Sequence, residues 1–329
     1  MEKLRKLPFA RIVAIASVAF ILLVVSGLIW YAHGHSIPVL QPKGEIGSKE
    51  RQLIFFALGL SVIVVVPVFI MLFSFAWKYR ASNTKASYQP NWDNSHLYEG
   101  LWWAIPSVLI VVLSVVTWQS SHQLDPYQPI KSNAQPLKVQ VVALQWKWLF
   151  MYPDQGVATV NYMPIPTDRP IDLTITSDAP MNAFWVPQLG GQVYAMAGMS
   201  MQLHLIADHA GAYEGRSSNI SGKGFADMTF TANAMPQASF DQWVTQTKGH
   251  HLDLTSATYA ALAKPATSKQ LTYGAVQPNL YDTIIKKYMG NMNTSTTDHN
   301  YHVDRPTAQH DMSDMPDMHG MSHDGMEME

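Results

Sequence analysis

The sequence contains no cysteine in 329 residues. Disulfide bonds and every metal site built on thiolate ligands are therefore excluded. Charged residues are also scarce, at 14% of the chain, and the formal net charge is −2 at pH 7. A nearly neutral chain gives no electrostatic reason to expect nucleic acid as a partner. Hydrophobic residues, in contrast, make up 47% and include 10 tryptophans, which favours a membrane-associated protein.

The first 34 residues combine a basic start with an apolar run. Lysines and arginines concentrate in residues 1–11, and residues 12–32 carry no charge. This order is typical of an export signal, yet a run of about 20 residues is also long enough to span a bilayer. Segment 1–34 is therefore either a cleaved signal peptide or a retained signal anchor, and both remain open.

Two further charge-free runs, 53–77 and 100–118, lie within segment 35–121. Each is long enough, at about 1.5 Å per residue, to cross the hydrocarbon core of a membrane. Lys78 and Arg80 directly follow the first run, which favours the cytoplasm for the connecting loop. Together with the export signal, this predicts a transmembrane helical hairpin, with everything after about residue 120 outside the cytoplasm.

From residue 137 the apolar pattern changes to an alternation of period two. Short strand-like runs occur at residues 138–142, 171–176, 192–196, 201–206 and 228–232. Glycine and proline separate them at short intervals, which is typical of a β-sandwich or barrel. Segment 122–235 is therefore predicted to be an extracytoplasmic all-β domain, with a proline-marked linker up to about residue 136.

The remainder divides into a helical part and a tail. Segment 236–290 shows helical periodicity at 239–247, 255–263 and 279–289. Residues 291–329 are rich in Met, His and Asp and offer too little apolar surface to fold, so we expect disorder there. The predicted fold class is a membrane α-helical hairpin plus an all-β sandwich, with short C-terminal helices and a disordered tail.

Residues 211–228 have the rhythm of a copper-binding loop from which the ligands are missing. Ser217 and Ser221 stand four residues apart, where a soft dinuclear copper site needs thiolates. Phe225 stands near the place for an imidazole, and Met228 closes the stretch. The pattern indicates an electron-transfer loop without the means to carry electrons.

The hairpin, the β domain and this loop together resemble subunit II of the haem–copper terminal oxidases, and within them the cytochrome bo-type ubiquinol oxidase branch. The likeness covers about residues 40–290. Its runs are PKGEIG at 42–47, FAWKYRASN at 75–83, PNW at 90–92, WKW at 146–148, YP at 152–153, QGVATVN at 155–161 and YAMAGM at 194–199. The resemblance implies a cupredoxin fold for the β domain.

The resemblance also implies the partners and the chemistry. Subunit I would hold haem b, a haem of o or a type, and copper; it would oxidise ubiquinol, reduce dioxygen to water and pump protons. Subunits III and IV would complete the complex. This chain would bind no cofactor itself, contact membrane lipid, and place its large C-terminal domain on the periplasmic side of a bacterial cytoplasmic (inner) membrane. Neither nucleic acid nor cytochrome c is expected as a partner.

In the cytochrome c oxidase branch, subunit II carries two coppers. Mapped onto this chain by resemblance, their cysteines become Ser217 and Ser221 and their histidines become Asn182 and Phe225, so that Met228 alone is retained. Copper affinity should therefore collapse. The resemblance to the quinol oxidase branch places Leu28 where its bacterial members often carry a lipidated cysteine, so thioether lipidation is also excluded.

Three further sets of residues have both a functional and a plainer interpretation. Glu99, just before the second span, resembles the cytoplasmic mouth of a proton-input channel, and is otherwise an ordinary interfacial carboxylate. Trp146 and Trp148 resemble the aromatic segment that faces subunit I; they would then be docking residues, while alternating aromatics on a strand are more often packing.

The tail is the third set. Its methionines and histidines suit monovalent copper, and its alternative is a solvated low-complexity end. The metal candidates are Met312, Met315, Met318, His319, Met321 and His323. A copper-handling, cupredoxin-like membrane protein is therefore the alternative function. A cytochrome c oxidase subunit II is a second alternative, and the lost ligands argue against it.

Overall fold

The computed structural model describes residues 23, 26–27, 30, 37–84 and 94–289. Most of segment 1–34 and the whole Met/His-rich tail, including its six metal candidates, lie outside the described residues. A short 3-10 helix, η1 (Pro38–Leu40), precedes two long helices, α2 (Glu45–Lys78) and α3 (His96–Gln123). The apolar runs 53–77 and 100–118 lie inside these helices, which extend beyond them at both ends.

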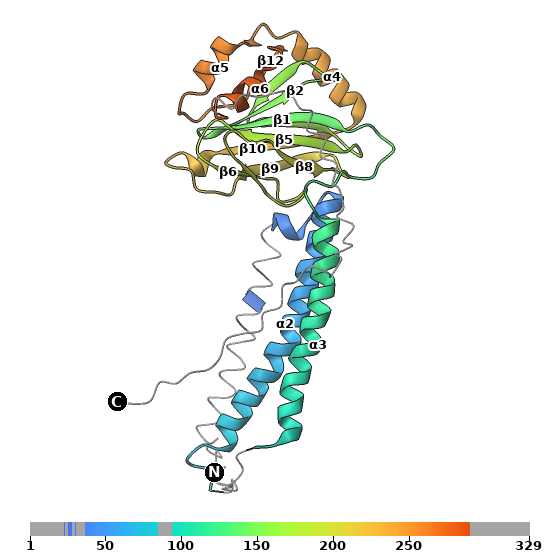
Figure 1. Ribbon diagram of the computed structural model, residues 1–329, viewed down its shortest axis with the longest axis vertical. Coiled ribbons are helices and arrows are strands. Elements are labelled where there is room, and N and C mark those ends of the chain that lie inside the picture. Colours follow the sequence, from blue (N-terminus) through green and yellow to red (C-terminus); the bar gives the residue numbers. More distant parts are fainter. Residues whose placement is uncertain (1–22, 24–25, 28–29, 31–36, 85–93, 290–329) are drawn as a thin grey trace, which may run out of the picture. The chain divides into compact units, whose positions relative to one another are not determined.

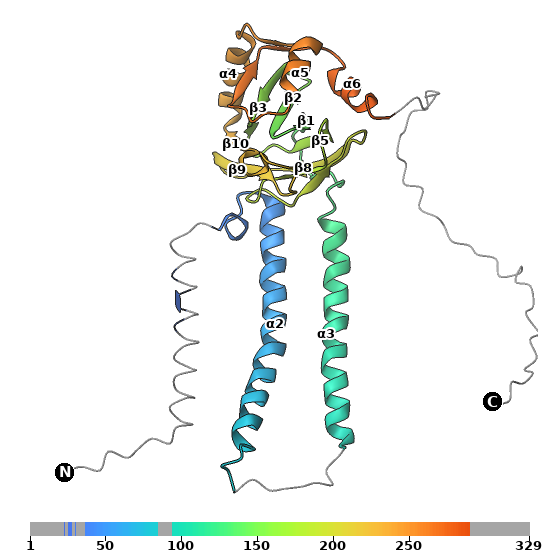
Figure 2. The same cartoon turned by 90° about the vertical axis from the view of Figure 1, so that its left-hand side faces the viewer.

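Both long helices continue through an internal proline. Pro67 lies within α2 and Pro106 within α3, and Figure 2 shows each helix as an unbroken rod. By length and composition, both are able to cross a membrane. Gly47 is the single buried residue of α2, and α3 has none. Helices that are apolar all round and exposed need lipid or partner helices to cover them.

The chain then forms two sheets packed face to face (Figure 1). The first has six strands, in the order β12 (Leu271–Tyr273), β3 (Val157–Val160), β2 (Lys147–Tyr152), β1 (Leu137–Leu144), β5 (Ile171–Ser177) and β8 (Met201–Leu205). The second has five, in the order β4 (Tyr162–Pro166), β10 (Thr229–Met235), β9 (Gly211–Ser217), β6 (Asn182–Trp185) and β7 (Val193–Ala195). The predicted sandwich is confirmed.

Aromatic side chains fill the space between the two sheets. Trp148 and Phe184 meet edge to face with ring centroids 5.3 Å apart, and Phe184 stacks on Phe230 at 5.0 Å. All three are buried. Such contacts add to the stabilisation that the buried apolar area provides.

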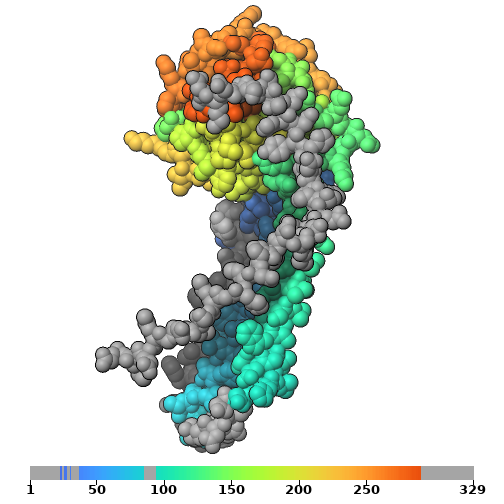
Figure 3. Space-filling model, viewed as in Figure 1, coloured from blue at the N-terminus to red at the C-terminus, as the bar shows by residue number. Residues whose placement is uncertain are grey.

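A third layer covers the outer face of the six-stranded sheet. It consists of α5 (Ser256–Leu262), α6 (Leu280–Lys286) and a small ribbon, β11 (Asp253–Leu254) with β13 (Ala275–Val276). Helix α4 (Gln237–Lys248) instead packs Phe240 into the core between the two sheets, against Tyr152. Tyr259, Leu280 and Ile284 from this segment form a second apolar cluster with Leu149 and Met151 of β2. In Figure 3 the orange and red atoms of this segment lie against the green atoms of the sheet.

The third layer explains why the sequence pattern did not reveal strand β2. All six residues of β2 are buried, because one face meets the inner core and the other meets the C-terminal segment. A strand covered on both faces has no polar side, so its sequence does not alternate. The stretch 211–228 also differs from the expectation of a loop: its first seven residues form β9, and the loop begins after Ser217.

The start of α2 is attached to the sandwich by backbone hydrogen bonds. Lys43 N–H donates to Gln188 O at 2.7 Å, Gly47 N–H to Leu189 O at 3.0 Å, and Asp208 N–H to Lys43 O at 2.9 Å. A Cβ on Gly44 would lie 2.2 Å from the carbonyl oxygen of Ile206, so the close approach requires glycine.

Candidate functional site

Two of the five positions that the resemblance maps to copper ligands lie where β6 begins and β9 ends. These strands pair antiparallel, which brings Asn182 and Ser217 together. Ser217 Oγ donates to Asn182 Oδ1 at 3.0 Å, and Asn182 Nδ2 donates to Pro180 O at 2.8 Å. Asn182 is 0% and Ser217 3% exposed. Their polar atoms therefore satisfy one another in the interior.

The other three positions are placed around this pair. Met228 is fully buried, and its carbonyl accepts the N–H of Ser217 at 3.1 Å. Phe225 begins a 3-10 helix, η2 (Phe225–Asp227), and is half-buried. The Ser221 hydroxyl is buried and has no hydrogen-bond partner within the described residues. The fold thus joins Asn182, Ser217 and Met228, while no hydrogen bond links the Ser221 side chain to them.

This set does not fit a dinuclear copper centre. Its donors are an amide, two hydroxyls and one thioether, whereas soft copper sites are built from thiolate, imidazole and thioether. The hydrogen bond between Ser217 and Asn182 already uses the atoms that would face a metal. Within the part of the chain that the structure describes, no three His, Asp or Glu side chains gather in a metal-binding arrangement.

Trp146 and Trp148 have different surroundings. Trp146 has φ 69° and lies over the loop, where a Cβ on Gly224 would come within 2.4 Å of the indole. Its indole N–H donates to Ser221 O at 3.3 Å. Trp148 is fully buried between the sheets and offers no surface to a partner. The contacts of Trp148 are therefore packing contacts, and Trp146 stays the docking candidate of the two.

Glu99 lies in the first turn of α3. Its side chain is 39% exposed, and its Oε2 is 3.5 Å from Nδ1 of His96, which is 94% exposed. A carboxylate in the first turn is favoured by the partial positive charge at a helix N-terminus. The group is thus accessible for proton exchange and lies at the end of a helix that is able to cross a membrane.

Asp178 lies outside every motif of the sequence, and its side chain is 1% exposed. It accepts hydrogen bonds from the Tyr259 hydroxyl at 2.6 Å, from Lys287 Nζ at 2.7 Å and from the Tyr288 hydroxyl. Burial alone would raise the pKa of Asp178, but these hydrogen bonds and the Lys287 charge lower it. The only sequence signal is a polar turn ending in Pro180, because the donors come from far along the chain.

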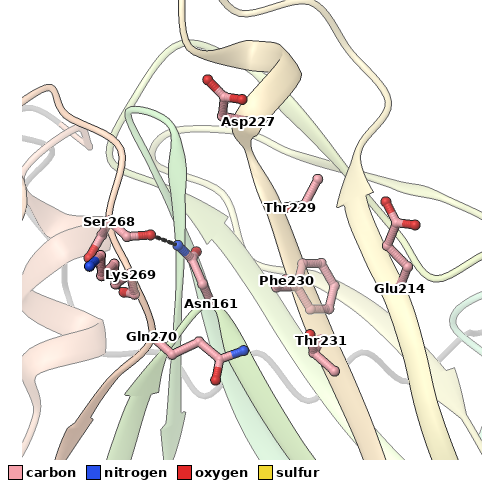
Figure 4. Close-up of a pocket in the computed structure, with 9 residues that line it drawn as sticks. All are labelled: Asn161, Glu214, Asp227, Thr229, Phe230, Thr231, Ser268, Lys269 and Gln270. Carbon is pink, nitrogen blue, oxygen red and sulfur yellow. Dashed lines mark hydrogen bonds between the residues drawn. The ribbon is translucent and has the colours of Figure 1, made fainter.

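A surface pocket of about 270 Å³ lies between the outer side of the five-stranded sheet and residues 268–270. Figure 4 shows Glu214 and Asp227 on one side of it, and the hydrogen bond from Asn161 Nδ2 to Ser268 O on the other. None of its nine lining residues is a predicted site residue. Glu214 and Asp227 belong to the stretch 211–228, but the pocket does not include any of the positions mapped to copper ligands.

Two protein-family models match this chain. Residues 155–235 match the model described as "Cytochrome C oxidase subunit II, periplasmic domain". Residues 248–292 match "COX Aromatic Rich Motif", and this range contains the ribbon and helices α5 and α6 of the third layer. The second range also contains β12, which belongs to the six-stranded sheet.

Curated relatives cover most of the chain. The "Cytochrome bo(3) ubiquinol oxidase subunit 2" of Pseudomonas aeruginosa is 44% identical over 287 residues, which are 86% of this chain and 87% of the relative. The "Ubiquinol oxidase subunit 2" of Acetobacter aceti is 46% identical over 261 residues, 79% of this chain and 85% of the relative. Among solved structures, the periplasmic domain of cytochrome oxidase subunit II (CoxB) of Bradyrhizobium japonicum is 23% identical, with a TM-score of 0.34, and covers 36% of this chain and 96% of that one.

Proposed function

Because this chain belongs to the family of ubiquinol oxidase subunit 2, we propose that it is the non-redox subunit II of a proton-pumping complex that oxidises ubiquinol and reduces dioxygen to water. The observation that carries the non-redox part is the hydrogen bond between Ser217 and Asn182, which occupies the interior where copper ligands would have to be. Hydroxyl and amide groups supply no ligand set for dinuclear copper.

The redox centres then belong to a partner. Subunit I would hold haem b, a haem of o or a type, and copper. Ubiquinol is soluble in the bilayer and would reduce that subunit directly, so no cytochrome c would donate through this chain. The two long apolar helices, exposed on all sides, support an attachment to lipid and to subunit I, with subunits III and IV completing the complex.

The chain would contribute assembly, docking and a proton entrance. The hairpin would lie in a bacterial inner membrane with the sandwich on the periplasmic side. Glu99 would then lie at the opposite, cytoplasmic end of α3, because it is in the first turn while the sandwich follows the last. An exposed carboxyl at that end is able to collect protons for subunit I.

A purified complex tests this function. The full-length chain would be tagged, the complex isolated from membranes, and its metals, haems and subunits counted. We expect oxidation of ubiquinol, no oxidation of reduced cytochrome c, and no copper beyond that of subunit I. Oxidation of cytochrome c, or a dinuclear copper signal from this chain, would refute the proposal. Isolation of the chain alone with copper on its Met/His-rich tail would favour the copper-handling alternative.

A further inference from the structure

The third layer is attached to the sandwich by more than apolar contacts. Lys147, at the start of β2, is 3% exposed and donates to Leu262 O at 2.8 Å and Lys264 O at 3.0 Å. Asp178, just after β5, accepts from Tyr259 of α5 and from two residues that follow α6. The segment from β11 to Tyr288 is thus held at both of its short helices by polar groups buried in the sandwich.

The attachment at Asp178 reaches the turn that precedes β6. Asp178 N–H donates to Ala143 O at 2.9 Å, which fixes the turn to β1. Within the turn, Ser177 Oγ donates to Ala179 O at 2.9 Å and accepts from Ala179 N–H at 3.1 Å. Asn182 Nδ2 then donates to Pro180 O at 2.8 Å. Each of these bonds restricts residues 177–182 to one conformation.

The same turn is hydrogen-bonded to the loop after β9. Ser217 Oγ donates to Asn182 Oδ1 at 3.0 Å, Ser218 N–H donates to Ala183 O at 3.0 Å, and Asn219 Nδ2 donates to Met181 O at 2.8 Å. The backbone of residues 178–183 therefore connects the hydrogen bonds of the C-terminal segment at Asp178 with those of residues 217–219. These are the two loops that a metal would have joined.

The C-terminal segment also contacts the neighbouring loop. Gly198 has φ 76°, and a Cβ placed on it would lie 3.1 Å from Cβ of Tyr288. The hydroxyl oxygens of Ser200 and Tyr281 are 3.2 Å apart, which is within hydrogen-bond distance. Residues 196–200 and 177–182 thus both lie against the part of the chain around α6 that carries Tyr281, Lys287 and Tyr288. The contacts of one segment converge on the loop end of the sandwich.

We propose that residues 253–288 are a clamp that holds the loops 177–182 and 217–219 in one conformation, with Asp178 as its positioning residue. The clamp holds the two loops together as a bound metal would, in a site that has no ligands for a metal. A buried carboxylate suits the task, because three donors converge on one charged group and such hydrogen bonds are stronger than neutral ones. The role assigned to residues 253–288 goes beyond the proposed function. The comparison with a metal cross-link rests on the proposed function.

Hydrogen–deuterium exchange of the full-length chain in its purified complex tests the clamp. Asp178→Ala should speed exchange by roughly tenfold or more in residues 253–288 and also in 177–182 and 217–219, since a buried bond to a charged group is lost. Strands β4 and β10, which Asp178 does not contact, should keep their rates. Asp282→Ala is the matched control: Asp282 is an exposed acid in the first turn of α6, so its loss should affect at most α6 and leave the rates of 177–182 and 217–219 unchanged.

The clamp is refuted if exchange quickens in 253–288 while 217–219 keeps its rate, since the segment would then be held without holding the loops. A uniform increase across β4 and β10 also refutes it, because that is general destabilisation. Should Asp178→Ala fail to fold, Tyr288→Phe removes one hydroxyl and leaves the other two donors in place. Tyr288→Phe should give the same regional pattern with a smaller increase in exchange rate. An unchanged exchange rate of residues 217–219 in this variant also refutes the clamp. The outcome is independent of which electron donor the complex uses.

Discussion

Ser217 and Asn182 lie at facing ends of two paired strands, and the serine hydroxyl donates to the asparagine amide oxygen at 3.0 Å. We propose, from the resemblance alone, that both residues stand at positions of copper ligands in the electron-transfer subunits. The polar atoms that join this pair therefore have partners in the interior, whereas the Ser221 hydroxyl has none within the described residues.

The first prediction concerns this hydrogen bond. In Ser217→Ala the Asn182 oxygen loses its donor in a buried place, which should lower the unfolding free energy of the sandwich by about 1–3 kcal/mol. Denaturant unfolding of the full-length chain, followed by tryptophan fluorescence, measures the change. Ser239→Ala, at an exposed position of α4, should stay within about 0.5 kcal/mol of the original chain. Equal stability of the two variants would contradict the role of the Ser217 hydroxyl.

The second prediction is a pH dependence. The pKa of Asp178 is lowered, so its contribution is present above the unfolded value of 3.8 and is lost as the pH falls below it. The pKa of Lys287 is raised, chiefly by its hydrogen bond to Asp178, so its contribution is present below 10.5 and is lost as the pH rises further. Lys287 is 58% exposed, so solvent screening keeps its share small.

Asp178→Asn makes this dependence measurable. The original chain should exceed the variant in unfolding free energy by about 1.5–3 kcal/mol between roughly pH 5 and pH 9. The difference should shrink below about pH 4, where the carboxylate takes up its proton. Denaturant unfolding of both chains at a series of pH values tests it. A difference that grows toward acid would mean that the sign is wrong.

The third prediction concerns the joint between α2 and the sandwich. Gly44→Ala places a methyl group 2.2 Å from the carbonyl oxygen of Ile206, which is backbone and does not move aside easily. Crowding of this kind costs about 1–3 kcal/mol, so the melting temperature of the purified complex should fall. Gly59→Ala makes the same change within α2, where nothing lies within 4 Å, and should not lower it. An unchanged melting temperature of the Gly44→Ala complex would show that the backbone around Gly44 and Ile206 moves to accommodate the methyl group.

The fourth prediction concerns proton entry. Glu99→Gln keeps the shape of the side chain but removes the group that exchanges protons, so dioxygen consumption with ubiquinol should slow by roughly tenfold or more. Haem content and subunit composition should not change. His96→Asn removes the neighbouring ring and keeps the carboxyl, and should leave most of the rate. Full activity of Glu99→Gln at neutral pH would remove Glu99 from the proton path.

Much of this architecture is visible in the sequence because it depends on local pattern. A run without charges such as 53–77 satisfies its backbone within one helix, so length and composition suffice to predict it. Strands β1 and β5 were predicted in the same way, since their polar and apolar residues largely alternate. The absence of thiolates at Ser217 and Ser221 likewise excludes a thiolate-bridged copper centre from composition alone.

Other features depend on contacts between distant residues, and only the tertiary structure decides them. All six residues of β2 are buried, because residues about 100 positions later form a third layer over the outer face of this strand. Lys147 and Leu262, which are hydrogen-bonded, are 115 positions apart. Asp178 receives its donors from 81 and 109 positions away, at Tyr259 and Lys287. The sequence by itself determined the helical spans, the β class and the absence of thiolate ligands, since each follows from composition or from neighbouring residues. The packing of the C-terminal segment determined what holds the loop end together, since that depends on side chains that only folding brings within hydrogen-bond distance.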